Sequence, residues 1–289
     1  HTILDTARYD GSFYTTSPAA RILAELALPK DLIDWSDAGA IANLKIIAPA
    51  CGTGTLLAAS KQVCVDRYRD ACLEKGGVQR DAEKNMDVLR LCLIEDVLHG
   101  LDINLSAIHL TASMLASADP HIAFNRMNIH RAKLGKFGGG GVFIGSPSLL
   151  SSGQLALYEA AHSTQQVEDK KEEKVDYGNK MDLIIMNPPF TRGDLRHKQL
   201  LDNVKNEVLD EEKKWIKTHG NGNGYKLSAS ESSHFFHPLS HGLGKEKGGR
   251  LAMILPFSML IAPKGLPTRK YLAHHWHIEQ VITSHELCM

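Results

Sequence analysis

Each of three short apolar segments in this 289-residue chain is followed at once by glycine, proline or polar residues, and helix-forming stretches separate the three. The segments Leu44–Ala48, Leu98–Ile103 and Met181–Met186 have the length and apolar character of buried β-strands. Alternation of strand and helix predicts an α/β fold with a doubly wound, mostly parallel sheet. Ligands of such a sheet bind at the carboxyl ends of its strands, near the point where strand order reverses. The residues that follow the three segments are therefore the first candidates for a functional site.

The other expected elements follow from the same patterns. Pro18–Leu28 is predicted to be a helix with Ser17 as its N-cap, and Leu105–Ala118 is predicted to be another. The long amphipathic stretch Ser60–Leu98 is expected to hold two helices that break at Gly76-Gly77. Further strands are expected at three apolar segments: Val142–Gly145, Gly249–Leu255 and His277–Thr283.

Composition excludes several classes of protein. Lys and Arg number 33, and so do Asp and Glu, so the net charge is zero and the chain is not a strongly basic nucleic-acid binder. The five cysteines show no C-x-x-C spacing, which predicts neither a zinc ribbon nor a redox dithiol and is typical of a cytoplasmic protein. No apolar run approaches the roughly 20 residues of a membrane span. We expect no metal site and no membrane contact.

A glycine-rich turn, Cys51-Gly52-Thr53-Gly54, lies between a predicted strand and a predicted helix. Glycines in this position let the backbone approach a bound nucleoside or amino-acid group closely. Leu57 stands where a dinucleotide site would have its third glycine, and the Lys-Ser/Thr of a phosphate loop is missing. The turn alone is weak evidence for a ligand, because a purely structural turn has the same residues.

Asp102 ends the second predicted strand, and two roles are open to it. Its carboxylate could accept hydrogen bonds from both ribose hydroxyls of a nucleoside ligand. Alternatively, Asp102 or Asn104 could be the N-cap of the helix that follows. The neighbouring glycine turn favours the ribose role.

The segment Asn187-Pro188-Pro189-Phe190 is the most informative motif. Two prolines make a rigid turn, so Asn187 and the carbonyl of Pro188 point in fixed directions. Both present oxygen acceptors, which suit an –NH2 group with two N–H bonds to satisfy. Phe190 offers a flat face on which a base can stack. The motif therefore indicates chemistry on an exocyclic amine, whose lone pair such acceptors would direct at an electrophile.

The order of these motifs resembles that of the adenine-specific DNA methyltransferases that use S-adenosylmethionine, as in type I modification subunits and fused type II restriction–modification enzymes. Upstream of the glycine turn, Gly11, Phe13-Tyr14-Thr15 and Pro18 are similar to the segment that precedes this turn in the family. Downstream, Gly248–Pro256 and His277–Ser284 are similar to two later strands of the family. The resemblance covers the chain from Arg8 to about Ser284.

This resemblance implies a Rossmann-like class I methyltransferase fold, S-adenosylmethionine as the cofactor, and methyl transfer to the amino group of a flipped-out adenine in double-stranded DNA, as part of a restriction–modification system. The implied catalytic residues are Asn187, Pro188, Pro189 and Phe190. The implied cofactor-binding residues are Tyr14, Thr15, Pro49, Ala50, Cys51, Gly52, Thr53, Gly54, Thr55, Asp102, Ile103, Ser146 and Asn187.

Two positions depart from the family pattern. Thr16 replaces the usual proline after the aromatic segment, and Ser146-Pro147 stands where the family often has an acidic residue that holds the cofactor's adenine. Residues 1–43 are expected to form an N-terminal helical segment with the aromatic motif, and residues 44–289 a catalytic domain that is incomplete at its C-terminus. On this view the chain is a piece of a longer protein, which has a specificity or nuclease region on the same chain or on a partner subunit.

Two other classes of protein remain open. RNA guanine and protein glutamine methyltransferases resemble the chain at the glycine turn, but they usually carry Tyr where Phe190 stands. A non-catalytic DNA-specificity subunit could also keep the fold; the intact Gly52, Gly54 and Asn187 disfavour it.

Overall fold

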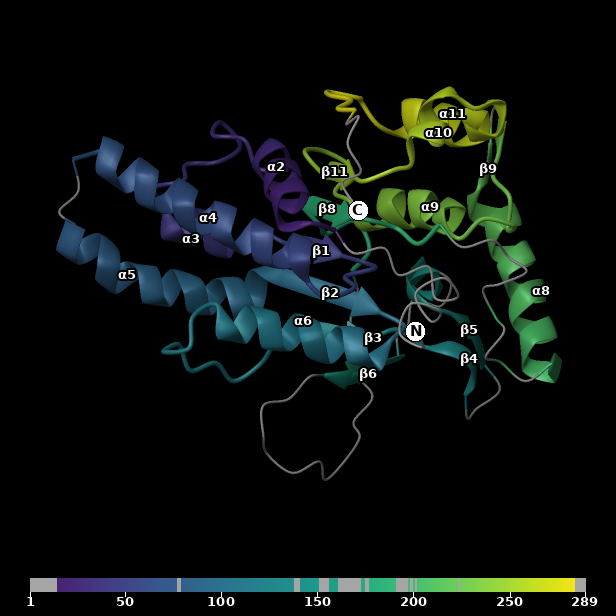
Figure 1. Ribbon diagram of the computed structural model, residues 1–289, viewed down its shortest axis with the longest axis horizontal. Coiled ribbons are helices and arrows are strands. Elements are labelled where there is room, and N and C mark those ends of the chain that lie inside the picture. Colours follow the sequence, from purple (N-terminus) through teal and green to yellow (C-terminus); the bar gives the residue numbers. More distant parts are fainter. Residues whose placement is uncertain are drawn as a thin grey trace.

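The computed structural model describes residues 15–76, 79–137, 141–150, 156–160, 173–174, 177–190, 197, 200, 202–222 and 224–283 (Figure 1). Its centre is a sheet that has seven strands in this described part of the chain, in the spatial order β11-β8-β1-β2-β3-β6-β7. The bounds of these strands are β1 Ile46–Ala48, β2 Leu98–Asp102, β3 Asn128–Arg131, β6 Ala156–Ala160, β7 Glu173–Lys174, β8 Leu183–Met186 and β11 Arg250–Met253.

The five strands from β11 to β3 are parallel, and β6 and β7 are antiparallel to their neighbours. The chain forms β1, β2 and β3 in one direction across the sheet and then returns to add β8 and β11 on the other side of β1. Strand order therefore reverses between β1 and β8. This arrangement confirms the expected α/β fold with a doubly wound, mostly parallel sheet.

Helices cover both faces of the sheet. Their bounds are α2 Ser17–Ala27, α3 Ala38–Ala42, α4 Thr55–Glu74, α5 Gln79–Cys92, α6 Leu105–Ser117, α8 Asp202–His219, α9 Ser233–Leu243, α10 Phe257–Ile261 and α11 Leu266–His275. A π-helical turn, η1 (Leu93–Val97), leads directly into β2, and two short 3-10 helices are η2 (Ser146–Leu150) and η3 (Pro263–Gly265). Among the described residues, every helix is too short or too polar to cross a membrane.

Side chains of the central strands alternate between two hydrophobic clusters. Ile46 and Ile185 point into a cluster formed with α2 to α6, whereas Ile47 and Ile184 point into a cluster that contains Trp215 of α8 and residues of α9. All four isoleucines are fully buried. Because both faces are covered, β1 and β8 are continuous apolar runs rather than alternating ones, which makes them recognisable in the sequence.

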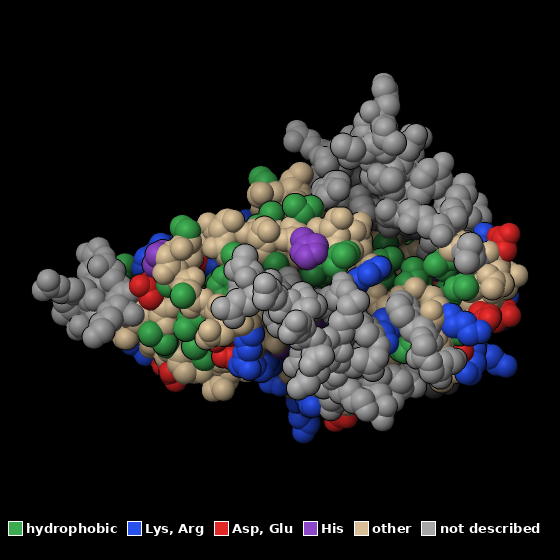
Figure 2. All heavy atoms as spheres, turned by 90° about the horizontal axis from the view of Figure 1, so that it is seen from below, with side chains coloured by type: hydrophobic (Ala, Val, Ile, Leu, Met, Phe, Trp, Pro, Cys, Tyr) green, Lys and Arg blue, Asp and Glu red, His purple; other side chains and the backbone are tan. Residues whose placement is uncertain are grey.

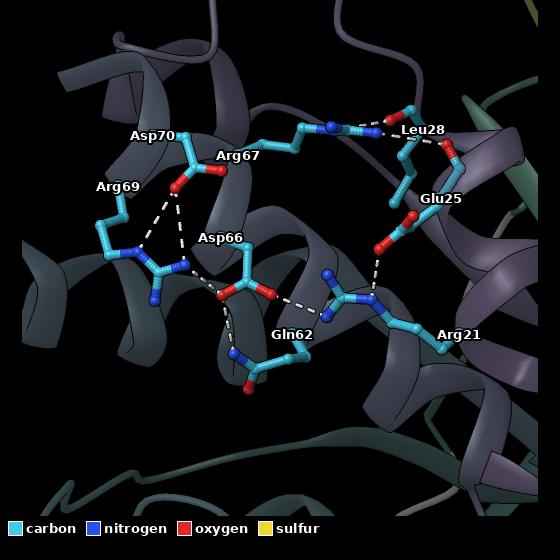
Figure 3. Close-up of polar contacts among 8 residues, drawn as sticks. All are labelled: Arg21, Glu25, Leu28, Gln62, Asp66, Arg67, Arg69 and Asp70. Atoms are coloured by element: carbon cyan, nitrogen blue, oxygen red, sulfur yellow. Dashed lines mark hydrogen bonds and ion pairs between the residues drawn. The ribbon is translucent and has the colours of Figure 1, made fainter. Parts of the chain in front are cut away.

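The N-terminal helix α2 is fixed on α4 by small residues and polar contacts (Figure 3). Arg21 of α2 donates a hydrogen bond of 2.7 Å to the carboxylate of Asp66, and Arg67 of α4 donates to the carbonyls of Leu28 and Glu25 at 3.3 and 3.5 Å. Ala20, Ala24 and Ala27 are buried in the contact. The middle and the C-terminal end of α2 are therefore held on α4.

The strand predicted at Val142–Gly145 is not part of the central sheet, and this prediction was wrong. The segment predicted at Val142–Gly145 does contain β5 (Gly141–Ile144), but β5 pairs antiparallel with β4 (Leu134–Phe137) in a separate hairpin. The third central strand is β3, whose polar sequence Asn128–Arg131 hid it. A second small hairpin joins β9 (Asn221–Gly222) and β10 (Tyr225–Lys226).

The predicted sixth strand, His277–Thr283, is not a strand. This segment has no regular structure, and Ile278, Val281 and Ile282 are more than half exposed. Its link to the sheet is the ion pair of Glu279 with Arg250 of β11, in which two guanidinium nitrogens lie 3.2 and 2.6 Å from the carboxylate oxygens. An apolar alternating pattern is not sufficient for a strand when no partner strand pairs with it.

At the helix ends, one prediction was wrong and one is confirmed. Ser17 is the first residue of α2 rather than its N-cap; Thr16 is the N-cap, and its side chain makes no capping hydrogen bond. The expected break in the long helical stretch is confirmed, because α4 ends at Glu74 and α5 begins at Gln79.

Candidate active site

The glycine loop and the Asn-Pro-Pro-Phe turn follow neighbouring strands. Residues Pro49–Thr55 follow β1, and Asn187–Phe190 follow β8, which pairs with β1. Asp102 ends β2, on the other side of β1. The three predicted segments therefore meet at the carboxyl edge of the sheet, next to the point where strand order reverses.

The glycine loop is a tight turn that needs its glycines. The Gly54 N–H donates to the Cys51 carbonyl at 2.9 Å, and the Cys51 N–H donates to the Leu101 carbonyl of β2 at 2.8 Å. Gly52 and Gly54 have φ values of 56° and 85°, in the left-handed region that side chains disfavour. A Cβ on Gly54 would lie 2.9 Å from the Cα of Thr111 on α6, whereas a Cβ on Gly52 would meet no described residue within 4 Å.

The loop's other side chains differ in burial. Pro49 and Cys51 are buried, and Ala50, Thr53 and Thr55 are half-buried. The Thr53 and Thr55 hydroxyl oxygens lie 3.2 Å apart. Burial, with a smaller contribution from the Asp102 charge, raises the pKa of the Cys51 thiol well above its usual range. This thiol is therefore protonated at neutral pH and is not a nucleophile.

Asp102 holds backbone amides on both sides of its carboxylate. Oδ2 accepts a hydrogen bond of 3.0 Å from the Gly52 N–H, and Oδ1 accepts one of 2.9 Å from the Asn104 N–H. The N-cap of α6 is Asn104, whose side chain accepts from the Ser106 N–H at 2.9 Å. Helix capping, the alternative role for Asp102, thus belongs to Asn104.

Ile103 and Ser146 lie beside these segments. Ile103 is 41% exposed, and its carbonyl accepts a hydrogen bond from Arg131. Ser146, at the start of η2, is buried, and its hydroxyl donates to the carbonyl of Pro49 at 2.6 Å. Ser146 therefore contacts the backbone at the entry to the glycine loop.

The turn after β8 joins the N-terminal segment. The side-chain amide of Asn187 donates to the Thr15 hydroxyl at 3.2 Å, across 172 positions of sequence. Pro188 is buried, and Asn187, Pro189 and Phe190 are half-buried. The structure thus brings Thr15 together with Asn187; Tyr14 lies outside the described residues.

Sequence reasoning did not identify Thr111, which contacts the glycine loop from α6. Its hydroxyl donates to the Gly52 carbonyl at 2.9 Å, and the side chain is fully buried. A polar residue on the buried face of the helix after β2 was the only available signal. Histidines, cysteines and acids form no group of three able to hold a metal among the described residues.

A family model for Eco57I restriction-modification methylases matches residues 96–287, which is more than half of the chain. The chain belongs to this family. This membership confirms the resemblance found in the sequence. No curated protein matches the sequence.

Solved structures are similar over most of the chain. The methyltransferase subunit of a type I restriction-modification system from Streptococcus thermophilus is 15% identical with a TM-score of 0.43, over 91% of this chain and 39% of that one. A nuclease-deletion mutant of the type ISP restriction-modification enzyme LlaGI, in complex with a DNA substrate mimic, is 14% identical with a TM-score of 0.48, over 90% and 19% of the two chains. The ATP-dependent type ISP enzyme LlaBIII bound to DNA is 14% identical with a TM-score of 0.44, over 90% and 16%. The present chain thus spans well under half the length of these proteins.

Proposed function

We propose that this chain is the catalytic part of a DNA methyltransferase that transfers a methyl group from S-adenosylmethionine to the exocyclic amino group of adenine. The observation that carries the proposal is the pairing of β1 with β8. This pairing sets a glycine loop suited to a nucleoside beside a rigid turn suited to an amine. Membership of the methylase family supports the same reaction class.

The residues at the edge of the sheet suit S-adenosylmethionine. No atom of the described residues lies within 4 Å of a Cβ built on Gly52, so that part of the chain leaves room for a ligand to approach the loop backbone there. Asp102 accepts the ribose hydroxyls in this proposal, and its carboxylate is oriented by the hydrogen bonds that it accepts from the Gly52 and Asn104 amides. Ile103, which is partly exposed, covers an apolar face of the ligand. Tyr14 and Thr15 are further proposed contacts of the cofactor.

Ser146 has a different role in this proposal from the one suggested by the family pattern. Its only hydroxyl hydrogen goes to the Pro49 carbonyl, so Ser146 cannot donate that hydrogen to the cofactor's adenine. It orients the entry to the glycine loop instead.

The Asn-Pro-Pro-Phe turn binds the target base in this proposal. The base leaves the DNA stack, at a cost of a few kcal/mol, and Phe190 stacks on it. The side-chain oxygen of Asn187 and the carbonyl of Pro188 each accept a hydrogen bond from one N–H group of the amine, and Pro189 keeps the turn rigid. The nitrogen lone pair is then directed away from the ring.

When bound, S-adenosylmethionine would supply a methyl group on a sulfonium centre. The lone pair of the amine would form its new bond to the methyl carbon, and the electron pair of the carbon–sulfur bond would pass to sulfur. The proton of the methylated amine passes to water. Positioning and fixed acceptors carry the rate, so the residues need not include a strong base.

Double-stranded DNA is the proposed substrate, and a specificity or nuclease region, on the same parent chain or on a partner subunit, is the proposed source of sequence selection. The charges on the described surface support the proposal that another region contributes to DNA binding. Acidic and basic side chains lie intermingled at the end of the molecule that carries α8 (Figure 2), where Lys136 pairs with Glu207 and Lys213 with Asp210. Paired lysines contribute little to a field that attracts phosphates.

The decisive experiment measures methyl transfer from radiolabelled S-adenosylmethionine to duplex DNA, RNA and protein in parallel. We expect label in DNA, recovered as N6-methyladenine after digestion, and its loss in the Asn187→Ala variant. Label in RNA or in protein glutamine instead would assign the chain to one of the two other methyltransferase classes. Binding of S-adenosylmethionine without transfer to any acceptor, even with added cell extract, would favour a non-catalytic subunit.

A further inference from the structure

The two peptide groups that flank Gly52 are both held by side chains from outside the glycine loop. The N–H on one side donates to Asp102 Oδ2 at 3.0 Å, and the carbonyl on the other side accepts from the Thr111 hydroxyl at 2.9 Å. Asp102 ends β2, and Thr111 lies on α6, the helix that follows. Gly52 has a left-handed φ of 56°, and glycine is the most flexible residue type. These two hydrogen bonds therefore restrict a residue that could otherwise change conformation freely.

Thr111 is suited to this role by its surroundings. Its side chain is 0% exposed, so no water competes for the Gly52 carbonyl from that side. The Cys51 sulfur lies 3.6 Å from the same hydroxyl, a longer and weaker contact than the one to Gly52. The backbone of Thr111 also fills the space beside Gly54, where a Cβ would approach within 2.9 Å. One residue of α6 thus packs against both glycines of the loop.

We propose that Thr111 is a positioning residue for the cofactor: its hydroxyl locks Gly52, and through Gly52 it fixes the direction in which Asp102 faces the ligand. This inference rests on the proposed use of S-adenosylmethionine. Loss of the hydroxyl leaves the Gly52 carbonyl without its buried donor, and the peptide between Gly52 and Thr53 is then free to rotate. Asp102 keeps its charge but loses a fixed partner, so the cofactor has to order the loop on binding.

The test compares Thr111→Val, which removes the hydroxyl at nearly constant shape, with Thr111→Ser, which keeps it. The dissociation constant of S-adenosylmethionine is measured by calorimetry on the full chain, and kcat is measured at saturating cofactor. We expect Thr111→Val to weaken binding roughly ten- to hundredfold, the range for a buried acceptor left unsatisfied. Thr111→Ser is expected to bind within about twofold of wild type, and kcat is expected to change little in both.

Thr268 of α11 supplies a matched control. It is also a buried threonine, at 1% exposure, but its hydroxyl makes no hydrogen bond within the described residues. Thr268→Val should leave cofactor affinity unchanged. If Thr111→Val melts below the assay temperature, Thr111→Ala, which adds no methyl group beside the loop, has to show the same loss of affinity.

The possible outcomes distinguish failure of the proposed function from failure of the role inferred for Thr111. Wild-type chain that binds no S-adenosylmethionine would overturn the proposed function and this inference with it. Wild type that binds, with Thr111→Val binding equally well, would overturn the inference alone. A lower melting temperature in Thr111→Val without a change in affinity would likewise overturn it, because it would give Thr111 a purely structural role.

Discussion

The side-chain amide of Asn187 donates a hydrogen bond to the hydroxyl of Thr15 at 3.2 Å. Thr15 immediately precedes the N-cap of α2, and Asn187 follows the last residue of β8. Because the amide nitrogen is engaged by Thr15, the amide plane is fixed and its oxygen has a defined direction. Thr15 of the N-terminal segment therefore orients Asn187, the residue that we propose accepts a hydrogen bond from the target amine. The two residues are 172 positions apart in the sequence.

Asn187→Ala should abolish turnover while cofactor affinity changes less. The substitution removes one of the two proposed acceptors of the target amine, an interaction that matters most when the nitrogen becomes pyramidal. Removal of one preorganised polar group from a transition state typically costs about 10²–10³ in kcat. Single-turnover methylation of DNA and calorimetry with S-adenosylmethionine would measure the two effects separately. Methylation by this variant at close to the wild-type rate would refute the proposed mechanism.

Thr15→Val tests the orientation of Asn187 without removing it. The variant loses the hydroxyl that accepts from the amide, so the amide can rotate and its oxygen is less often directed at the target. We expect kcat to fall by roughly tenfold, the equivalent of one neutral hydrogen bond of about 1 kcal/mol or slightly more. Thr15→Ser, which keeps the acceptor, is the matched control and should restore most of the rate. Equal rates in both variants would show that the contact does not orient Asn187.

Asp102→Ala should weaken cofactor binding strongly. The variant loses the proposed ribose acceptor and the partner of the Gly52 N–H together. Hydrogen bonds to charged groups contribute about 1.5–3 kcal/mol, so the dissociation constant should rise at least tenfold. Asn104→Ala is the control: it removes the N-cap of α6, at a cost of about 1 kcal/mol in stability, and leaves the carboxylate in place. Unchanged affinity in Asp102→Ala, measured by calorimetry, would exclude the ribose role.

The sequence was sufficient to predict the parts of the fold that are buried on both faces. The strands β1 and β8 are continuous apolar runs because helices cover both sides of them, and β2 is buried from Leu98 to Leu101, so the polar residues at the strand ends stand out. The contact between these ends follows from parallel topology, since carboxyl ends of parallel strands share one edge. The candidate site was predictable for this reason.

The elements that depend on a partner were not predictable. β3 is a polar strand, Asn128–Arg131, that owes its place to pairing with β2 and β6. By contrast, His277–Thr283 has the pattern of a strand but pairs with nothing among the described residues, and its isoleucines and valine stay exposed. β5 is a real strand whose partner, β4, is local rather than central. In each case the pairing decided the outcome, and single-sequence patterns do not contain it.

Protonation of His237 should destabilise the fold in acid. This side chain on α9 is fully buried, and burial, with a smaller effect from His234, lowers its pKa to about 3. In the unfolded chain the group titrates near 6.5, so below that pH the unfolded state binds the proton and the folded state does not. His237 therefore does not lower the free energy of unfolding above pH 6.5. Below that pH the free energy of unfolding decreases, and it continues to do so until the pH reaches about 3. We expect His237 to account for a loss of roughly 2–3 kcal/mol between pH 6.5 and 4.5.

His237→Phe tests the assignment, because it keeps a buried ring and removes the titration. Urea unfolding at several pH values between 4.5 and 7.5 should give a flatter profile for this variant than for the wild type. His121→Phe is a suitable control, since His121 is more than half exposed and pairs with Asp87 at the surface. Identical pH profiles in His237→Phe and the wild type would assign the acid sensitivity to other groups.

DNA binding by residues 1–289 alone should be weak and without sequence preference. The net charge is zero, and two exposed lysines of α8 pair with nearby acids, Lys213 with Asp210 and Lys214 with Glu211. Specific recognition needs several cationic contacts to phosphates, and binding that depends on them weakens steeply with salt. Anisotropy titrations with random and candidate duplexes at 50 and 200 mM salt would measure both properties. Nanomolar, sequence-selective binding would instead show that the recognition surface lies within this chain, and the segment 191–233 would be the first to examine.

Alanine substitutions at three glycines with left-handed φ can distinguish the effect of backbone strain from the effect of a lost cofactor contact. Gly52, Gly54 and Gly76 have φ values of 56°, 85° and 74°, so each alanine variant carries a similar strain of about 1–2 kcal/mol. Gly76 follows the end of α4, and a Cβ there would meet nothing within 4 Å in the described part of the chain, so Gly76→Ala should lower stability while leaving cofactor affinity unchanged. Gly54→Ala should lose more stability than the others, because its methyl group would meet the backbone of Thr111 at 2.9 Å.

Gly52→Ala is the informative member of this series. Its methyl group meets no atom of the described residues within 4 Å, so its stability should match that of Gly76→Ala. If S-adenosylmethionine occupies the open space above Gly52, the methyl group will collide with it, and affinity should fall at least tenfold more than in Gly76→Ala. Melting temperatures with and without cofactor, together with calorimetry, would measure both quantities in the three variants. Equal affinities in Gly52→Ala and Gly76→Ala would mean that the cofactor does not approach the loop at Gly52, and the glycine would then serve only the turn.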